Sequence, residues 1–159
     1  MKNITYSIIT GNVKFSDYQE TGKLAESYFH THNHPDEMQI SDELAKFIIK
    51  NFPEFDNIIK NNGEVIGFTF ILPCTKEGMD LFLNNKITEN KLTDYIKYSI
   101  LNKKYESFYL CVAFIVPEFR NKHIIFDGFK IHINKLLTLS KNPEFFCWIY
   151  SNEGKNLII

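Results

Sequence analysis

Residues Phe108–Leu137 decide the fold, and they read F-Y-L-C-V-A-F-I-V-P-E-F-R-N-K-H-I-I-F-D-G-F-K-I-H-I-N-K-L-L. Their first part, Phe108–Val116, is apolar, rich in aromatic and β-branched residues and followed by Pro117, which predicts a buried strand. After a short polar loop, apolar residues at positions 126, 129, 133, 136 and 137 predict a helix. A strand, a loop and a helix N-terminus in this order are typical of an anion-binding site. The first N–H groups of a helix lack intrahelical partners, and the helix dipole is positive there.

The loop itself is basic. Arg120 and Lys122 add full positive charges, and Arg120 is the only arginine in the chain. A solvated turn is the alternative role for both side chains, but the strand, proline and helix around them favour anion binding. His123 either hydrogen-bonds a phosphate or is a neutral surface histidine, because the helix dipole opposes its protonation.

The same segment resembles the acetyl-CoA-binding motif of the GCN5-related N-acetyltransferases (GNATs), which reads roughly V-x-P-x-x-R/Q-x-x-G-x-G/A. Residues Val116–Ile125 occupy that motif, and Arg120 matches its leading R/Q. His123 and Ile125 stand where the family usually has glycine or alanine. Glycine matters at such positions because its missing Cβ lets the backbone close on a pyrophosphate.

The resemblance implies that acetyl-CoA is a co-substrate bound at the end of this strand and in the following loop. It implies that backbone groups of Phe114, Ile115 and Val116 hold the pantetheine arm. Loop amides would hold the pyrophosphate, and the residues that match them are Arg120, Asn121, Lys122, His123, Ile124 and Ile125. Asn152 resembles an asparagine that often opens the next helix of the family, and it completes the expected cofactor-binding set.

The implied reaction is direct attack of an amine on the thioester, which needs a base, an oxyanion donor and an acid. Some members of the family carry a base glutamate early in this strand. Tyr109 stands at that position and Glu106 lies three residues before it, so both are candidate catalytic residues. A glutamate at a strand entrance is otherwise simply solvated. The tyrosine acid that the family carries further on has no counterpart in residues 151–159, so a non-catalytic binding module of the same fold is an alternative.

A histidine cluster supports a third hypothesis, a metal-dependent protein. Residues 30–34 read H-T-H-N-H, and on an extended strand His30, His32 and His34 would share a face suited to Zn²⁺. Asp36 and Glu37 add oxygen ligands. A predicted helix end and the following proline oppose a regular strand, so no metal ligand is assigned. A histidine here could instead contact the acceptor.

Composition limits the class of protein. A chain of 159 residues with 44% hydrophobic and 23% charged residues is ordinary for one globular domain over residues 1–159. A net charge of −1 gives no electrostatic argument for nucleic acid or anionic membrane as a partner. No apolar run approaches the roughly 18 residues of a membrane span, and the N-terminus does not read as a signal peptide. Three cysteines in strand-like contexts predict reduced core thiols in a cytoplasmic protein.

Periodicity and turn residues predict the other elements. Strands are predicted at Ile4–Ile9, Phe55–Lys60, Glu64–Leu72 and Phe145–Tyr150. Helices are predicted at Ser16–His30, from the cap Ser41 to Asn51, at Lys76–Asn84 and Glu89–Leu101 with caps Thr75 and Thr88, and at about Ile124–Ser140. Asn61-Asn62-Gly63 predicts a hairpin turn. Gly67, inside a strand, predicts a bulge or a close backbone approach.

This order matches the GNAT layout from its first strand to its fifth. It predicts an α/β (α+β) fold with a mixed, mostly antiparallel central sheet flanked by helices. The stretch at about 75–105 is then a helical insertion on the substrate side. The first hypothesis is therefore an N-acetyltransferase with a small-molecule or peptide amine as acceptor. The apolar edge strand at Phe145–Tyr150 favours a homodimer.

Overall fold

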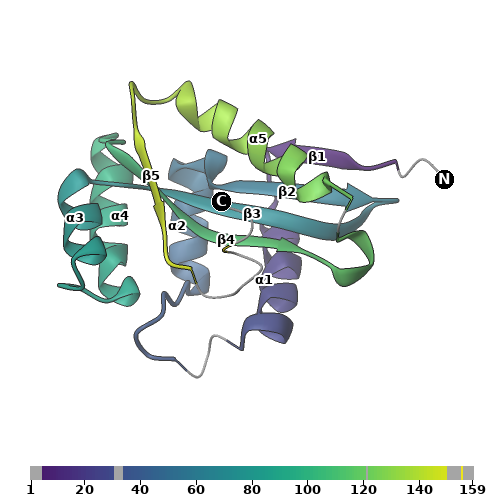
Figure 1. Cartoon of the computed structure of the whole chain (residues 1–159), viewed down its shortest axis with the longest axis horizontal. Helices are drawn as coiled ribbons and strands as arrows, with labels where there is room; N and C mark the ends of the chain where they lie inside the picture. The colour runs from purple at the N-terminus through teal and green to yellow at the C-terminus, as the bar shows by residue number, and fades with distance from the viewer. Residues whose placement is uncertain (1–4, 31–33, 121, 150–154, 156–159) are drawn as a thin grey trace.

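The computed structural model describes residues 5–30, 34–120, 122–149 and 155. It contains a five-stranded sheet in the order β1-β2-β3-β4-β5 (Figure 1). The strands are β1 (Ser7–Thr10), β2 (Asp56–Asn61), β3 (Glu64–Cys74), β4 (Ser107–Ile115) and β5 (Glu144–Cys147). Strands β1 to β4 pair antiparallel, whereas β5 runs parallel to β4. The predicted mixed, mostly antiparallel sheet is confirmed.

Five helices and two 3₁₀ turns complete the described part of the chain. They are α1 (Phe15–Phe29), α2 (Asp42–Asn51), η2 (Pro53–Phe55), α3 (Lys76–Leu83), α4 (Glu89–Asn102), η3 (Pro117–Phe119) and α5 (Ile124–Leu137). The two helices predicted between residues 75 and 105 are α3 and α4, which lie at the end of the sheet where β3 finishes and β4 begins (Figure 1). None of these helices is both long and apolar enough to span a bilayer.

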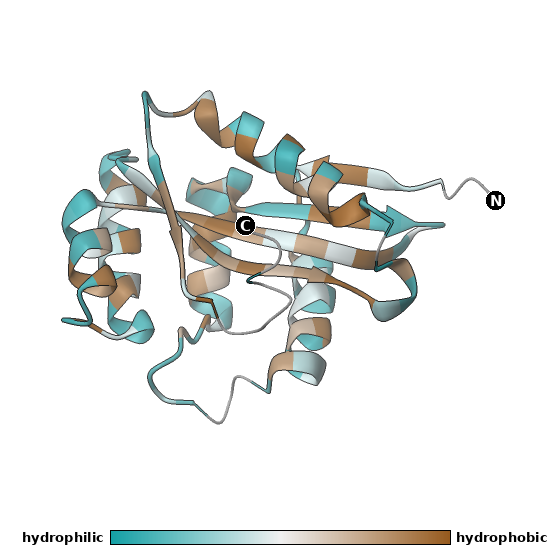
Figure 2. Cartoon of the chain, in the orientation of Figure 1, coloured by the Kyte–Doolittle hydropathy of each residue, from teal (hydrophilic) through white to brown (hydrophobic). Residues whose placement is uncertain are grey.

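Helices cover both faces of the sheet, and the strand residues alternate accordingly. Ile58 is buried in the larger core, to which α1 and α2 contribute. Its neighbour Ile59 packs instead in a smaller cluster with Ile124 at the start of α5. Figure 2 shows apolar residues gathered along the central strands and on the helix faces turned toward them. The sheet is therefore buried on both sides, which explains why β3 and β4 read as nearly continuous apolar runs.

The predicted helix starts have the expected caps. The side-chain oxygens of Ser41, Thr75 and Thr88 accept the backbone N–H groups of the residues three positions on, at 3.2, 3.1 and 3.3 Å. Each cap satisfies one of the N–H groups that a helix leaves without an intrahelical partner. These short polar signals fix where α2, α3 and α4 begin.

Gly67 marks a close backbone approach, as predicted. A Cβ at this position would lie 2.8 Å from the carbonyl oxygen of Phe114 and 2.8 Å from Cδ1 of Ile115, both on β4. A bulge also lies here, because the β2–β3 register skips Ile66. A second bulge lies on β4, where Phe70 pairs with Val112 and Ile71 with Leu110, so Cys111 is the extra residue.

Two predicted elements end earlier than the sequence suggested. Helix α5 stops at Leu137, because Thr138 and Leu139 donate to carbonyls only three residues back, at 3.1 and 2.9 Å, which tightens the last turn. Strand β5 stops at Cys147 rather than at residue 150, which lies outside the described residues along with Ile4. The last β4–β5 pair is Leu110 with Cys147, directly before the Cys111 bulge interrupts the ladder.

A buried histidine joins α5 to the back of the sheet. His132 is fully buried, with Nδ1 2.7 Å from the Thr69 hydroxyl and Nε2 2.7 Å from the carbonyl oxygen of Glu54. A carbonyl only accepts, so Nε2 carries the proton and Nδ1 accepts from Thr69. Burial lowers the pKa of His132 to about 4, so the ring is neutral at pH 7. Thr69 pairs with Ala113 of β4, and this bond therefore supports the sheet behind the C-terminal half of β4.

Candidate active site

Strand β4 has two halves with different neighbours. From Ser107 to Leu110 it pairs with β3 on one side and β5 on the other. From Cys111 to Ile115 it pairs with β3 alone among the described residues. We call residues 107–110 the zipped half and residues 111–115 the open half.

Backbone groups of the open half face away from β3 at alternate residues. The N–H of Val116 donates to the carbonyl oxygen of Ile66 at 2.8 Å, so residues in phase with Val116 face β3. By the alternation of an antiparallel ladder, Ala113 and Ile115 present their N–H and C=O groups to the open edge. Extended backbone with free hydrogen-bonding groups can hold a ligand that runs along it, as an added strand would.

A cavity of about 740 Å³ lies against this open half. Its walls come from α1, the segment that joins α1 to α2, the open half of β4 and the end of β5. They are mostly apolar, with contributions from Tyr18, Phe29, Met38, Val112 and Trp148. Its size is that of an ordinary small-molecule site. The divergence of β4 from β5 therefore produces a pocket rather than a filled core.

A carboxylate from the first residue of α4 lines this cavity. Glu89, the first residue of α4, accepts a short hydrogen bond from the hydroxyl of Tyr109 on β4. Its other oxygen accepts the backbone N–H of Met38 at 2.8 Å. All three residues line the cavity. Two donors hold this carboxylate in one orientation, so the pair presents a positioned hydrogen-bond acceptor to whatever the cavity holds.

Tyr109 is the donor in this pair at all ordinary pH values. Burial is the main cause that raises the pKa of its hydroxyl, followed by the neighbouring Cys111 and Glu89. Burial likewise raises the pKa of the thiols of Cys111 and Cys147, which both line the cavity. The three cysteines are free, as predicted, and Cys111 packs against the core as well as lining the cavity with Cys147. Since both thiols are neutral, the carboxylate is the better base.

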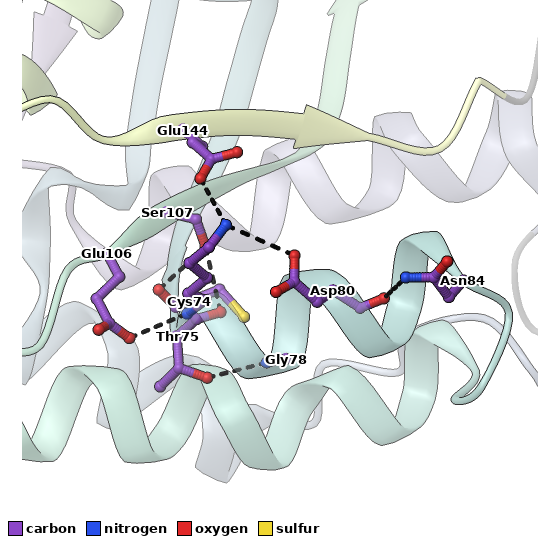
Figure 3. Close-up of polar contacts among 9 residues, drawn as sticks. Cys74, Thr75, Gly78, Asp80, Asn84, Glu106, Ser107 and Glu144 are labelled. Atoms are coloured by element: carbon purple, nitrogen blue, oxygen red, sulfur yellow. Dashed lines mark hydrogen bonds and ion pairs between the residues drawn. The ribbon is translucent and has the colours of Figure 1, made fainter.

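Glu106, the other predicted catalytic residue, lies elsewhere. It is exposed, and its carboxylate accepts the backbone N–H of Lys76 at the start of α3 at 3.0 Å, while Lys104 Nζ lies 3.4 Å away. Figure 3 shows it beside the first turn of α3, where the Lys76 ammonium also reaches Glu144 of β5 at 2.8 Å. Glu106 is not among the cavity-lining residues. Its observed contacts anchor α3 to the zipped half of β4.

The basic loop follows the open half directly. Arg120 is exposed, and its Nε donates to the carbonyl oxygen of Ile115 at 3.4 Å. Lys122 donates to the carbonyl of Glu118 at 2.8 Å and lies over the Phe119 ring, 5.0 Å from its centroid. Both cations therefore lie beside the start of α5, where the helix dipole is also positive.

The two substituted glycine positions differ in backbone conformation. His123 caps α5 with φ 58° and ψ 1°, in the left-handed region that glycine favours. Its backbone thus adopts a glycine-like turn in spite of its side chain. Ile124 and Ile125 pack in the apolar cluster around Ile59, so the Ile125 side chain is accommodated there. The first bond within α5 runs from Asp127 to His123, and earlier N–H groups of an α-helix have no intrahelical acceptor.

The predicted cofactor-binding residues thus divide into groups. Ile115 has backbone groups at the open edge, whereas the Val116 N–H is taken by β3 and Phe114 lies in phase with it. Arg120, Lys122, His123, Ile124 and Ile125 surround the start of α5. Asn121 and Asn152 lie outside the described residues. Ala113 was not predicted, but the strand register places its backbone groups at the open edge as well.

Sequence reasoning did not single out Glu89. As the first residue after the Thr88 cap, it looked like an ordinary acidic residue at a helix N-terminus. Its role depends on how α4 docks: the N–H of Asn90 donates to the carbonyl of Asp36 at 3.0 Å, which holds the α1–α2 connection against α4. No local pattern in the sequence encodes this contact.

The histidine cluster does not form a metal site among the residues that the structure describes. No group of three or more histidine, cysteine, aspartate or glutamate side chains is suitably placed there. His30 ends α1 in the left-handed region, with φ 51°, and His34 is exposed. His32 lies outside the described residues, so the complete cluster remains a sequence hypothesis.

No protein-family model and no curated protein matches the chain. Solved structures do. The loading GNATL domain of CurA from Lyngbya majuscula aligns with a TM-score of 0.59 at 14% identity, over 82% of this chain and 58% of that one. Ribosomal-protein-alanine N-acetyltransferase from Brucella melitensis biovar Abortus 2308 aligns with a TM-score of 0.59 at 12% identity, over 96% of this chain and 86% of that one. Glucosamine-6-phosphate N-acetyltransferase from Arabidopsis thaliana aligns with a TM-score of 0.53 at 12% identity, over 97% of this chain and 88% of that one.

These likenesses establish the fold that the sequence predicted, the acyl-CoA N-acyltransferase fold of the GNATs. The chain spans 58% of the CurA domain structure and more than four fifths of the other two.

Proposed function

We propose that this chain is an acetyl-CoA-dependent N-acetyltransferase that acts on a small amine. The observation that carries the proposal is the Glu89–Tyr109 pair inside a cavity that borders the open half of β4. A binding module of the same fold would need the cavity but not a positioned carboxylate within it. The N-acetyltransferases among the structural neighbours support the proposal at the level of fold.

The open half of β4 and the start of α5 would hold acetyl-CoA. The backbone groups of Ala113 and the N–H of Ile115, whose carbonyl already accepts from Arg120, would pair with the pantetheine arm as a strand does. The N-terminus of α5, with Arg120 and Lys122 beside it, offers N–H groups and positive charge to the phosphates. His123 adopts the left-handed conformation that a tight phosphate-binding turn requires. The residues present therefore fit the co-substrate.

Glu89 would act as the general base. Acetyl-CoA supplies an acetyl thioester, whose C–S bond breaks as the amine nitrogen forms the new C–N bond and whose thiolate leaves with a proton from water. Glu89 accepts the proton that the amine loses, at an oxygen already oriented by the Tyr109 hydroxyl and the Met38 N–H. A free N–H of the open half, at Ala113 or Ile115, would stabilise the negative charge on the carbonyl oxygen.

Calorimetric titration with acetyl-CoA tests the first half of the proposal. We expect micromolar binding that is weakened at least tenfold in an Arg120→Ala, Lys122→Ala variant and that falls with rising salt. The control is Lys103→Ala, Lys104→Ala, which removes the same charge at the end of α4. Absence of binding at millimolar acetyl-CoA by the folded chain would contradict the cofactor assignment.

Release of free thiol from acetyl-CoA, followed over a panel of small amines, tests the second half. Amine-dependent release is the expected result. Tight acetyl-CoA binding without transfer to any amine would favour the non-catalytic module instead. A cytoplasmic location, where acetyl-CoA and reduced thiols occur together, is part of the same proposal.

The homodimer stays a prediction. Phe145 of the edge strand β5 is 38% exposed, and Trp148 and Ile149 beyond it are about half exposed. Such an edge can pair with another chain. Light scattering on the eluted protein would measure the mass directly, and a Phe145→Lys variant would convert a β5-paired dimer into a monomer.

A further inference from the structure

Asp56, the first residue of β2, is buried without a partner. Its exposed fraction is 0%, and neither carboxyl oxygen has a hydrogen-bond partner among the residues that the structure describes. A buried carboxyl group normally has such partners, because losing water without replacing it is costly. Burial raises the pKa of Asp56 well above its ordinary value, the backbone N–H of Asn57 opposes this rise, and the nearby Asp17 adds to it. The fold therefore favours the neutral, protonated form of Asp56.

Asp56 lies behind one wall of the cavity. It is in phase with Ile58, on the face of the sheet that α1 and α2 cover, and it pairs with Phe70 of β3. The Tyr18 ring of α1 stacks on Phe70 with its centroid 5.9 Å away, and both residues line the cavity. The charge of Asp56 is also one of the causes that raise the pKa of Tyr18, after burial and Cys111. Asp56 and Tyr18 are thus neighbours where α1 meets the sheet.

The charged groups around Asp56 do not compensate an ionised carboxylate. On α1, Asp17 is acidic and binds Lys60 of β2 at 2.8 Å. On α2, Asp42 adds to the rise in the pKa of Tyr18, and Lys46 lies over an aromatic ring of α1, 5.1 Å from its centroid. Strand β1 and the part of β3 beside Asp56 carry no charged residue. An ionised Asp56 would therefore have to reach water, which requires a covering helix to move.

Helix α1 is held less firmly than the other helices that contribute to this core. Two of its fifteen residues, Tyr18 and Thr21, are buried, against three of ten in α2 and five of fourteen in α4. Its N-cap residue, Lys14, makes no side-chain cap bond, whereas α2 and α4 begin at capping hydroxyls. Segments with few buried side chains open at a lower free energy than the rest of a fold. Helix α1 is therefore the element expected to separate first.

We propose that Asp56 is a pH switch for the α1 wall of the cavity. With Asp56 protonated, α1 packs on the sheet and the wall is formed. With Asp56 ionised, α1 separates from β2 and the wall is lost, so the cavity holds any ligand more weakly as the pH rises. This inference concerns the wall alone. It depends neither on which ligand the cavity binds nor on the proposed function.

The direction of the effect follows from proton binding. Asp56 has a pKa of about 3.9 when it is exposed to water and a higher one in the folded chain. Between these two values the closed form binds more protons than the open form, so the equilibrium constant for opening rises by up to about tenfold per pH unit. The stabilisation is complete below about pH 4 and is lost as the pH rises through the folded pKa.

Urea unfolding between pH 5 and pH 8 tests this linkage in the parent, Asp56→Asn and Asp36→Asn. Asparagine keeps the shape of the Asp56 side chain but does not ionise. Asp36 is an exposed residue of the α1–α2 connection that does not line the cavity. All three proteins keep His132, so its titration cancels in the comparison. We expect the unfolding constant of the parent, relative to Asp56→Asn, to rise at least tenfold over this range, and relative to Asp36→Asn to stay within about twofold.

Native-state hydrogen exchange of the α1 amides separates a local opening from global unfolding. After correction for intrinsic exchange, we expect these amides in the parent to exchange faster than the global unfolding constant allows. Their protection should fall at least tenfold from pH 5 to pH 8. In Asp56→Asn this loss of protection with pH should be absent.

Two results would overturn the inference. An unfolding ratio that does not change with pH would show that Asp56 is not linked to stability. Exchange of α1 only through global unfolding would show that its wall does not open by itself. Asp56→Leu, which has the same branching and no polar side-chain atom, serves if Asp56→Asn does not fold, and it should be more stable than the parent at pH 8. Lower stability of Asp56→Leu at pH 8 would also contradict the switch. No measurement here uses acetyl-CoA, so this proposal and the proposed function can fail independently.

Discussion

The two halves of β4 differ in what holds them, and that difference separates a structural region from a candidate active site. The zipped half, residues 107–110, is flanked by β3 and β5. Its neighbour Glu106 binds the start of α3. The open half, residues 111–115, has only β3 as a strand partner in the described chain, and it borders the cavity. A bulge at Cys111 is the single irregularity between them.

The open half is supported through β3, the strand on its paired edge. Thr69 of β3 lies opposite Ala113, and its hydroxyl is hydrogen-bonded to the buried His132. Gly67 of β3 lets the backbones of β3 and β4 approach closely at Phe114 and Ile115. A strand that must leave one edge free for a ligand can be kept in place by such contacts on its other edge.

The largest difference between the halves should appear in catalysis. Glu89→Gln keeps the size of the side chain and one acceptor but removes the base, so we expect amine acetylation to fall about 10²- to 10³-fold at saturating substrate. Glu106→Gln, the matched change at the zipped half, should leave turnover within about twofold. Thiol release under initial-rate conditions measures both.

A structural role alone would give Glu89 a different signature. If Glu89 only anchored Met38 and Tyr109, Glu89→Gln would lower stability and raise KM without changing the pH profile. The base assignment predicts that the acidic limb of the pH–rate profile disappears in this variant. Equal losses in Glu89→Gln and Glu106→Gln would erase the functional contrast between the two halves.

The support behind the open half should depend on pH through His132. Its pKa is about 4 in the folded chain and about 6.5 when exposed, so the folded state binds fewer protons between these values. The stabilisation is complete above pH 6.5 and is lost as the pH falls to 4, by about 3 kcal/mol. Urea unfolding at pH 7 and pH 4.5 measures this loss.

His132→Gln is the matched variant for that titration. Glutamine offers a donor and an acceptor but takes up no proton in this pH range. The free energy of unfolding should therefore fall less between pH 7 and pH 4.5 in the variant than in the parent. The variant is expected to be less stable at pH 7, because its geometry toward Thr69 and Glu54 is not that of the ring. An identical pH dependence in both proteins would show that other groups cause the acid sensitivity.

The close approach at Gly67 gives a smaller, purely steric effect. Gly67→Ala places a methyl group 2.8 Å from the Phe114 carbonyl oxygen, a backbone atom that moves only with the strand. We expect the free energy of unfolding to fall by about 1–3 kcal/mol. Gly22→Ala is the control, since a Cβ there meets nothing within 4 Å in the middle of α1, and it should raise stability by up to about 1 kcal/mol. Equal effects would mean that the strands are not in tight contact.

Local signals in the sequence predicted the elements that surround the site. The caps Ser41, Thr75 and Thr88 are short-range features, and they placed three helix starts correctly. The hairpin at Asn62 and Gly63 follows from residues that tolerate positive φ, observed at 50° and 84°. Each of these depends on a few neighbouring residues, which is why sequence alone was sufficient.

The division of β4 could not be predicted in the same way. Residues on both sides of Cys111 are apolar, so the run looks uniform although its pairing changes at the bulge. Glu89 meets Tyr109 only because α4 packs on β3 and its first turn lies against the α1–α2 connection. Reasoning from position along the strand chose Glu106 instead, which is next to the strand in sequence but points to α3. Long-range packing decides which carboxylate enters the cavity.

The smallest predicted effect concerns the loop that ends the open half. His123 has φ 58°, a conformation that costs a residue with a Cβ about 1 kcal/mol, so His123→Gly should be as stable as the parent or more stable by up to about that amount. Lys103→Gly is the control, because Lys103 ends α4 with φ 50° and lies outside the cavity lining. Both variants should show similar changes in thermal unfolding.

Acetyl-CoA affinity then separates the two positions. Removing the His123 side chain lets the loop backbone approach the phosphates more closely, so we expect binding to tighten severalfold in His123→Gly and to stay unchanged in Lys103→Gly. Weaker binding in His123→Gly would mean that the imidazole itself contacts the phosphates. In that case the His123 side chain would be a phosphate ligand in its own right, and the loop after the open half would bind phosphate through an imidazole as well as through its backbone.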